Sequence, residues 1–140
     1  MIDFKKAFID TNPFIYFLER NEKYYTLTKN FFEKCYQKNK ELVNSTVTVE
    51  EYCVFPYTNQ DMDAIHNFEM FVEDMAIYTA DITNTIAKKA AQIRSEYKYF
   101  KAMDALQLAT AVVTGCDLFL TNDKQLIQFK EIKCITMDEL

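Results

Sequence analysis

Short apolar runs alternate with longer amphipathic segments along this chain, and the alternation restricts the fold more than any other feature of the sequence. Runs typical of β-strands are residues 6–9, 41–45, 76–78, 117–120 and 133–136. Helical patterns lie between them: one begins at Pro13, one near Thr48, and others cover residues 26–39, 61–74, 84–97, 102–114 and 122–129. Strands separated by helices pair in parallel, with helices on both faces. We therefore expect an α/β fold, a three-layer α/β/α sandwich around a parallel sheet of about five strands.

The composition predicts one domain, residues 1–140, of a cytoplasmic protein. Of the 140 residues 49% are hydrophobic, which is enough for a single core. No apolar run is long enough to cross a bilayer, and residues 1–6 lead into a strand and not into a signal-peptide core, so we expect no membrane association. The four cysteines are widely spaced without a CxxC pair, which predicts reduced, buried thiols and neither a zinc site nor a disulfide framework.

The charge limits how the protein can bind nucleic acid. The net charge is −5 at pH 7, whereas tight binding to any nucleic acid sequence requires many Lys and Arg contacts to phosphate. An enzyme that brings metal cations to the phosphate is still compatible with this charge, because the cation supplies the positive charge locally.

Four acids stand at the ends of strand-like runs or just inside a helical segment: Asp10, Glu51, Asp104 and Asp123. A parallel sheet gathers the carboxyl ends of its strands along one edge, and Asp10, Glu51 and Asp123 follow strands. Asp104 opens the helix that precedes a strand, so the pattern alone does not place it at this edge. Carboxylates that meet repel one another unless a cation neutralises them, and their hard oxygens suit Mg²⁺ or Mn²⁺ and not zinc.

Each acid also has a purely structural interpretation. Asp10 could cap the first helix, although Asn12 followed by Pro13 predicts a helix start there too. Asp104 and Asp123 would each favour the positive end of a helix dipole. Thr48 and Glu51 have the S/T-x-x-E spacing of a capping box.

Four segments in this order resemble the PIN domain: FIDTN at residues 8–12, STVTVEE at 45–51, MDALQLATA at 103–111 and LTND at 120–123. The similarity is to the compact prokaryotic ribonucleases that act as toxins of VapBC-type toxin–antitoxin pairs, and it covers nearly the whole chain. It implies an endoribonuclease that hydrolyses RNA phosphodiester bonds with Mg²⁺ or Mn²⁺. It also implies an RNA substrate, a cognate antitoxin protein and a homodimer as partners.

The same resemblance implies roles for individual residues. Asp10, Asp104 and Asp123 would form the metal-binding core, and Glu51 would be a further acid of the site. Its neighbour Glu50 remains the alternative, although the family places this acid three residues after the threonine. Thr121 and Asn12 would orient Asp10. Gln107 departs from the family, in which many members carry histidine, and we expect it to alter surface contacts around the site without replacing a metal ligand.

Other side chains have weaker patterns. Arg94, Lys98 and Lys101 recur at i, i+4 and i+7, so they could share a helix face that contacts the RNA backbone, or simply form a solvated face. Aromatic residues cluster in the first two helical segments, where most would be core and an exposed remainder could hold an antitoxin helix. The single histidine, His66, is expected to be an ordinary surface or packing residue.

Alternative functions stay open. A PIN nuclease that processes RNA without an antitoxin would have the same residues. A receiver-type Mg²⁺-binding phosphoacceptor domain would show an acidic pair after the first strand and a lysine after the last strand, and this chain has Asp10-Thr11 and Thr136-Met137 there. A phosphatase of the haloacid dehalogenase type would need Asp-x-Asp, which Asp10-Thr11-Asn12 does not supply.

Overall fold

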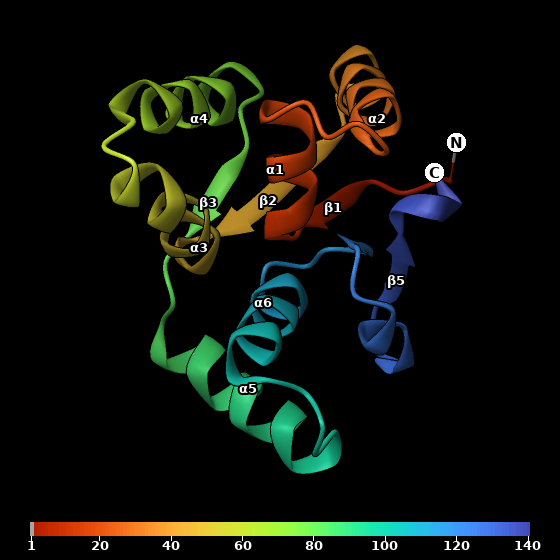
Figure 1. The fold of residues 1–140 in the computed structure, drawn as a ribbon. Helices are drawn as coiled ribbons and strands as arrows, with labels where there is room; N and C mark the ends of the chain where they lie inside the picture. The colour runs from red at the N-terminus through yellow and green to blue at the C-terminus, as the bar shows by residue number, and fades with distance from the viewer. Residues whose placement is uncertain (1) are drawn as a thin grey trace.

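A computed structural model describes residues 2–140 (Figure 1). Within these residues the strands are β1 Lys6–Ile9, β2 Glu41–Ser45, β3 Tyr78–Ala80, β4 Leu118–Thr121 and β5 Lys133–Thr136. The α-helices are α1 Thr11–Leu18, α2 Tyr25–Gln37, α3 Thr46–Thr58, α4 Met62–Asp74, α5 Asn84–Glu96 and α6 Ala102–Val113. Two short 3₁₀ helices follow the last strands, η1 Lys124–Gln128 and η2 Met137–Glu139.

The strands form one sheet in the order β3-β2-β1-β4-β5, and every neighbouring pair is parallel. The chain builds outward from β1 through β2 to β3, and then returns to the other side of β1 to add β4 and β5. The winding direction therefore reverses between β1 and β4. In open α/β sheets such a reversal leaves a crevice beyond the carboxyl ends of the two strands, which is where ligands bind.

Helices cover both faces of the sheet, as Figure 1 shows. One face, including Ile9, Leu42 and Leu120, packs in a core with α1, α2, α3 and α4. The other face, including Phe8 and Phe119, packs with α5 and α6. Adjacent strand residues point to opposite faces, so each central strand contributes to both cores. The predicted three-layer α/β/α sandwich around a parallel sheet is confirmed.

Most predicted elements are present but differ in where they begin or end, and the helix predicted at residues 122–129 is the 3₁₀ helix Lys124–Gln128. The strand predicted at residues 76–78 lies at Tyr78–Ala80, because Ala76 has φ 52° in the turn that follows α4. The first helix begins at Thr11 with Asp10 as its N-cap, so the predicted start at Asn12 and Pro13 is wrong. The third helix begins at Thr46, because the Ser45 hydroxyl accepts a hydrogen bond from the Val47 backbone and caps it there.

The interior contains polar groups as well as apolar ones. Asn44 in β2 is fully buried, and within residues 2–140 neither its amide nitrogen nor its amide oxygen has a hydrogen-bond partner. The four cysteines are buried and unpaired, as expected, and burial raises the pKa of the Cys35 and Cys134 thiols to about 12. In the described part of the chain, every helix is too short or too polar to cross a bilayer.

Candidate functional site

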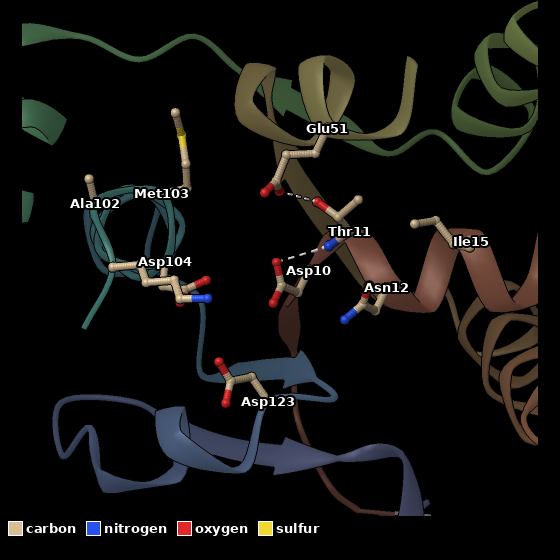
Figure 2. Close-up of a pocket in the computed structure, with 10 residues that line it drawn as sticks. Asp10, Thr11, Asn12, Ile15, Glu51, Ala102, Met103, Asp104 and Asp123 are labelled. Carbon is tan, nitrogen blue, oxygen red and sulfur yellow. Dashed lines mark hydrogen bonds between the residues drawn. The ribbon is translucent and has the colours of Figure 1, made fainter. Parts of the chain in front are cut away.

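A hollow of about 430 Å³ lies beyond the carboxyl end of the sheet. Its lining includes all of the predicted acids: Asp10, Glu51, Asp104 and Asp123. They come from the end of β1, from α3, from the first turn of α6 and from the residues after β4. Figure 2 shows their carboxylates directed toward one common space. Asp10 and Asp123 are more than a hundred positions apart in the sequence, and the crossovers of the sheet bring them together.

Asp10 is the most enclosed of these acids. Its backbone N–H donates to the Leu120 carbonyl at 2.9 Å, which extends the pairing of β1 and β4 by one residue. Its side chain is only 8% exposed and accepts hydrogen bonds from the Thr11 backbone at 2.9 Å and from the Thr121 hydroxyl at 2.8 Å. The pKa of Asp10 is raised to about 6, mainly by burial; the two hydrogen bonds oppose the shift, and the charges of Asp104 and Glu51 add to it. An ionised Asp10 would therefore be stabilised by a nearby cation.

Asp104 reaches the pocket from the amino end of α6. The sequence pattern could not place this helix end, but residues 101–104 all line the pocket. Burial raises the pKa of Asp104, the charges of Asp123 and Glu51 raise it further, and Lys101 partly opposes them. The repulsion among these carboxylates is the electrostatic signature of a site that holds positive charge.

Asp123 lies directly beyond β4. Its carboxylate accepts a hydrogen bond from the Gln125 backbone at 3.0 Å, so Asp123 is the N-cap of η1 and not a residue of the first helical turn, where the structural interpretation placed it. Its own backbone N–H donates to the Thr121 hydroxyl at 3.1 Å, and that hydroxyl donates to Asp10. Thr121 therefore fixes Asp10 and Asp123 relative to each other. Capping and lining the pocket are compatible, because only one carboxylate oxygen of Asp123 is used by the cap.

Glu51 extends from α3 across the pocket. The Thr11 hydroxyl donates to its carboxylate at 2.6 Å (Figure 2). The alternative interpretation, a capping box of Thr48 and Glu51, is wrong, because Ser45 caps the helix and Glu51 faces the site. Glu51 lines the pocket and Glu50 does not, which favours Glu51 as the acid of this site.

Asn12 and the basic residues differ from their predicted positions. Asn12 lines the pocket but is exposed, and no hydrogen bond between residues 2–140 joins it to Asp10, since Thr11 donates in its place. The prediction that Arg94, Lys98 and Lys101 share one helix face is wrong, because α5 ends at Glu96 and a turn follows. Of these basic side chains only Lys101 lines the pocket.

Several polar residues of the site lie beneath the acids and were not predicted. Gln107 is 1% exposed and bonded to Ser45 and Thr48, so the expectation that it shapes surface contacts is wrong. Thr11 holds Glu51, and its role was also missed. The available signal was a glutamine within the otherwise apolar run ALQLA at residues 105–109, which is unusual on a buried helix face.

The pocket suits a hydrated, hard divalent cation. No group of three or more His, Cys, Asp or Glu side chains within residues 2–140 is close enough to enclose an ion directly. The acids instead surround an open space of about 430 Å³, and neither His nor Cys lines it. Mg²⁺ keeps several of its waters and binds proteins through one or two carboxylates, whereas structural zinc requires a closed shell of nitrogen and sulfur ligands. The oxygen donors present fit Mg²⁺ or Mn²⁺ and not zinc.

Solved structures that share this fold include two toxin–antitoxin assemblies and one toxin. VapBC2 from Rickettsia felis, bound to a DNA fragment from its promoter, matches with a TM-score of 0.77 and 14% identity. The match covers 94% of this chain and 98% of that one. A toxin–antitoxin complex from Klebsiella pneumoniae matches with a TM-score of 0.73 and 22% identity over 94% and 97%. Mycobacterium tuberculosis VapC20, described as a sarcin-ricin loop cleaving toxin, matches with a TM-score of 0.66 and 14% identity over 91% and 98%.

Among curated proteins, no match to this chain is found. The model of one protein family, the PIN domain, matches residues 7–132 and so spans every acid of the pocket. The sequence match, the parallel sheet and the placement of the acids agree with one another. This chain belongs to the PIN domain family.

Proposed function

We propose that this protein is a metal-dependent endoribonuclease that hydrolyses RNA phosphodiester bonds, with residues 1–140 acting as one nuclease domain. The observation that carries the proposal is the convergence of Asp10, Glu51, Asp104 and Asp123 on one pocket at the reversal point of the sheet. Acids that cap helices for structural reasons have no need to face a common space. Membership of the PIN domain family supports the same activity.

Asp10, Asp104 and Asp123 would hold Mg²⁺ or Mn²⁺, with Glu51 as a further acid. When bound, the cation supplies charge neutralisation for the scissile phosphate and a water of lowered pKa. Asp10 is oriented by Thr11 and Thr121, so its carboxylate is preorganised toward the pocket. Glu51 uses Oε1 for the bond from Thr11, which leaves its second oxygen available to accept a proton or orient a water. The exposed His66 on α4 lies outside the pocket lining and is not needed as a base.

RNA is the proposed substrate. VapC20, which shares the fold, is described as cleaving the sarcin-ricin loop, an RNA element, and the pocket offers a cation and Lys101 to a phosphate backbone. The net charge of −5 disfavours a broad phosphate-binding surface, so bound metal would supply positive charge to the scissile phosphate. Arg94 and Lys98 are exposed and would make at most peripheral backbone contacts.

An antitoxin and a second copy of the chain are the proposed protein partners, in the cytoplasm. Solved structures with this fold include toxin–antitoxin complexes. A hollow of about 490 Å³ between α1, α2 and α4 has Phe17, Tyr25 and Phe71 in its lining, which suits the apolar face of an antitoxin helix. The exposed side chains of Val54, Phe55 and Tyr57 on α3 would supply apolar area for a dimer contact.

The experiment that tests the proposal is cleavage of RNA by the wild type and by site variants in the presence of Mg²⁺ or Mn²⁺. Asp10→Asn and Asp104→Asn should each lose more than about a hundredfold in cleavage rate while keeping the circular dichroism of the wild type, because even residues that only orient metal ligands contribute 10 to 100-fold. Glu51→Gln should also lose activity. Glu50→Gln is the matched control, since Glu50 is its neighbour but does not line the pocket.

Retained cleavage in Asp10→Asn and Asp104→Asn would contradict the proposal. Equal losses in Glu50→Gln and Glu51→Gln would show that the effect is one of surface charge and not of the site. Cleavage that persists after chelation of divalent cations would exclude the metal-dependent reaction.

A further inference from the structure

Gln107 is a buried polar residue whose side-chain hydrogen bonds all join it to residues outside its own helix. It is 1% exposed, and Ala105, Leu108 and Ala109 around it on α6 are fully buried. The other buried polar side chain of this helix, Thr110, bonds to the Leu106 carbonyl one turn back at 2.7 Å. The Thr110 hydroxyl therefore finds its hydrogen-bond acceptor within its own helix, whereas the Gln107 amide depends on other elements for its hydrogen bonds.

The amide of Gln107 joins α6 to the start of α3 and to the end of β1. Its carbonyl oxygen accepts a hydrogen bond from the Ser45 hydroxyl. Its amide nitrogen donates to the Thr48 hydroxyl at 2.8 Å and, through a longer contact of 3.4 Å, to Oδ1 of Asp10. Ser45 also caps α3, so this amide lies where a strand end, a helix start and the pocket meet.

The carboxylate of Asp10 fixes the orientation of this amide. With the nitrogen toward Asp10, the group adds a donor to those from Thr11 and Thr121. The reversed amide would place its carbonyl oxygen against the carboxylate, where two partial negative charges repel. The three donors to Asp10 come from α1, β4 and α6, so the carboxylate is held from three directions.

The same amide is also connected to Glu51, through the hydroxyl groups of Thr48 and Thr11. Gln107 fixes the Thr48 hydroxyl, which lies 3.5 Å from the hydroxyl of Thr11. The Thr11 hydroxyl in turn donates to Glu51 at 2.6 Å. A single buried side chain is therefore connected to two of the carboxylates that line the pocket.

We infer that Gln107 is a positioning residue that holds Asp10 directly, and Glu51 through Thr48 and Thr11, in the arrangement that receives a divalent cation. The inference rests on the proposed function only in taking that cation as the ligand of the pocket. Carboxylates held by fixed donors need less rearrangement to bind a metal, so loss of the donors weakens metal affinity even when every ligand remains.

Calorimetric titration of the purified chain with Mn²⁺ tests this role. Gln107→Met keeps the length of the side chain but removes both hydrogen-bonding groups, and its affinity for Mn²⁺ should fall by about 10 to 100-fold. Gln107→His retains one donor and one acceptor and should recover part of that loss. Thr110→Val is the matched control, because it removes a buried hydroxyl from the same helix that does not face the pocket, and its Mn²⁺ affinity should equal that of the wild type.

Unchanged Mn²⁺ affinity in Gln107→Met, or an equal loss in Thr110→Val, would overturn the inference. If Gln107→Met does not fold, Thr48→Val removes the next group of the network and should weaken Mn²⁺ binding in the same direction. Crystal structures without metal give an independent readout: in Gln107→Met the Asp10 and Glu51 carboxylates should be displaced, and in Thr110→Val they should not. If the wild type itself binds no Mn²⁺, the proposed function fails, while unchanged carboxylates in the Gln107→Met structure would reject the positioning role.

Discussion

Among single residues, Asp10 is a buried carboxylate that also lines the candidate site. It caps α1, it extends the sheet by one residue and it lines the pocket. Burial raises its pKa to about 6 even though backbone and hydroxyl donors oppose the shift. The fold therefore maintains a carboxylate whose ionised form is destabilised by burial, which is expected of a group that receives a cation.

The metal-free protein should consequently lose stability as the pH rises through the range set by Asp10. The pKa of Asp10 is raised from 3.8 to about 6 on folding, so the folded state binds this proton more tightly than the unfolded state. The resulting stabilisation is complete below pH 3.8 and is lost by about pH 6, with a size on the order of 3 kcal/mol. Other carboxyl groups titrate in the same range, so the measurement is the difference between the wild type and Asp10→Asn in urea unfolding at several pH values.

Asp10→Asn should gain in stability relative to the wild type as the pH rises from about 4 to 7 in the presence of a chelator. A difference between the two proteins that does not change with pH would contradict the assignment of this pKa. If the asparagine variant had a clearly lower melting temperature at neutral pH, the carboxylate would serve mainly as a helix cap.

At the scale of elements, the sequence was most informative where a signal was local. The bounds of β2 and β5 are as predicted, because each has an apolar pair, Leu42-Val43 or Cys134-Ile135, between polar flanks. The starts of α1 and α3 were misplaced because neighbouring residues were equally able to cap: Asn12 competed with Asp10, and Thr48 with Ser45. The choice depends on where strand pairing ends, and pairing involves residues far away in the chain.

In the candidate site, too, features with a local sequence signal were predicted, and features that depend on distant residues were not. The acids were predicted from their order and spacing, but the sequence left Glu50 as an alternative to Glu51, and the lining of the pocket favours Glu51. The network of Gln107, Ser45 and Thr48 was not predicted, because it depends on three elements meeting in space. The basic face was predicted wrongly because charge spacing is informative only while a helix continues, and α5 ends at Glu96.

The interior of β2 gives a prediction at this scale. Asn44 is fully buried, and in the part of the chain that the structure describes its amide has no partner. Asn44→Leu keeps the branch at Cγ and the number of side-chain heavy atoms and removes an unsatisfied polar group, so the free energy of unfolding should rise by about 1 to 2 kcal/mol. Asn67→Leu on the exposed surface of α4 is the control and should change it by less than about 0.5 kcal/mol. Chemical denaturation measures both, and a destabilised Asn44→Leu would indicate that the amide has an ordered partner such as water.

At the scale of the whole molecule, the topology explains why the acids meet. The sheet reverses its winding at β1, and β1 lies between β2 and β4, so the residues that follow these three strands share one edge. The amino end of α6, in the helical layer that covers the other face of the sheet, completes the pocket. The acids lie on one edge of a protein with a net charge of −5, so a bound cation is needed to bring phosphate there.

This charge distribution predicts that Lys101 matters more for RNA than the other basic residues of its region. Lys101→Glu should weaken binding of a single-stranded RNA to the cleavage-deficient Asp104→Asn protein and should reduce the salt dependence of binding by about one ion. Arg94→Glu, which changes an exposed residue outside the pocket lining, should have a smaller effect. Equal effects of the two substitutions, measured by fluorescence anisotropy over a range of salt concentrations, would show that RNA does not enter by the pocket.

The proposed activity depends on the carboxylates forming a divalent cation site. Anomalous diffraction at the manganese absorption edge, from crystals soaked in Mn²⁺, locates such a cation. An anomalous peak is expected in the pocket between Asp10, Asp104 and Asp123, and no such peak is expected in crystals of Asp10→Asn. A pocket without a peak at saturating Mn²⁺, or a peak found only elsewhere on the protein, would contradict the proposed cation site.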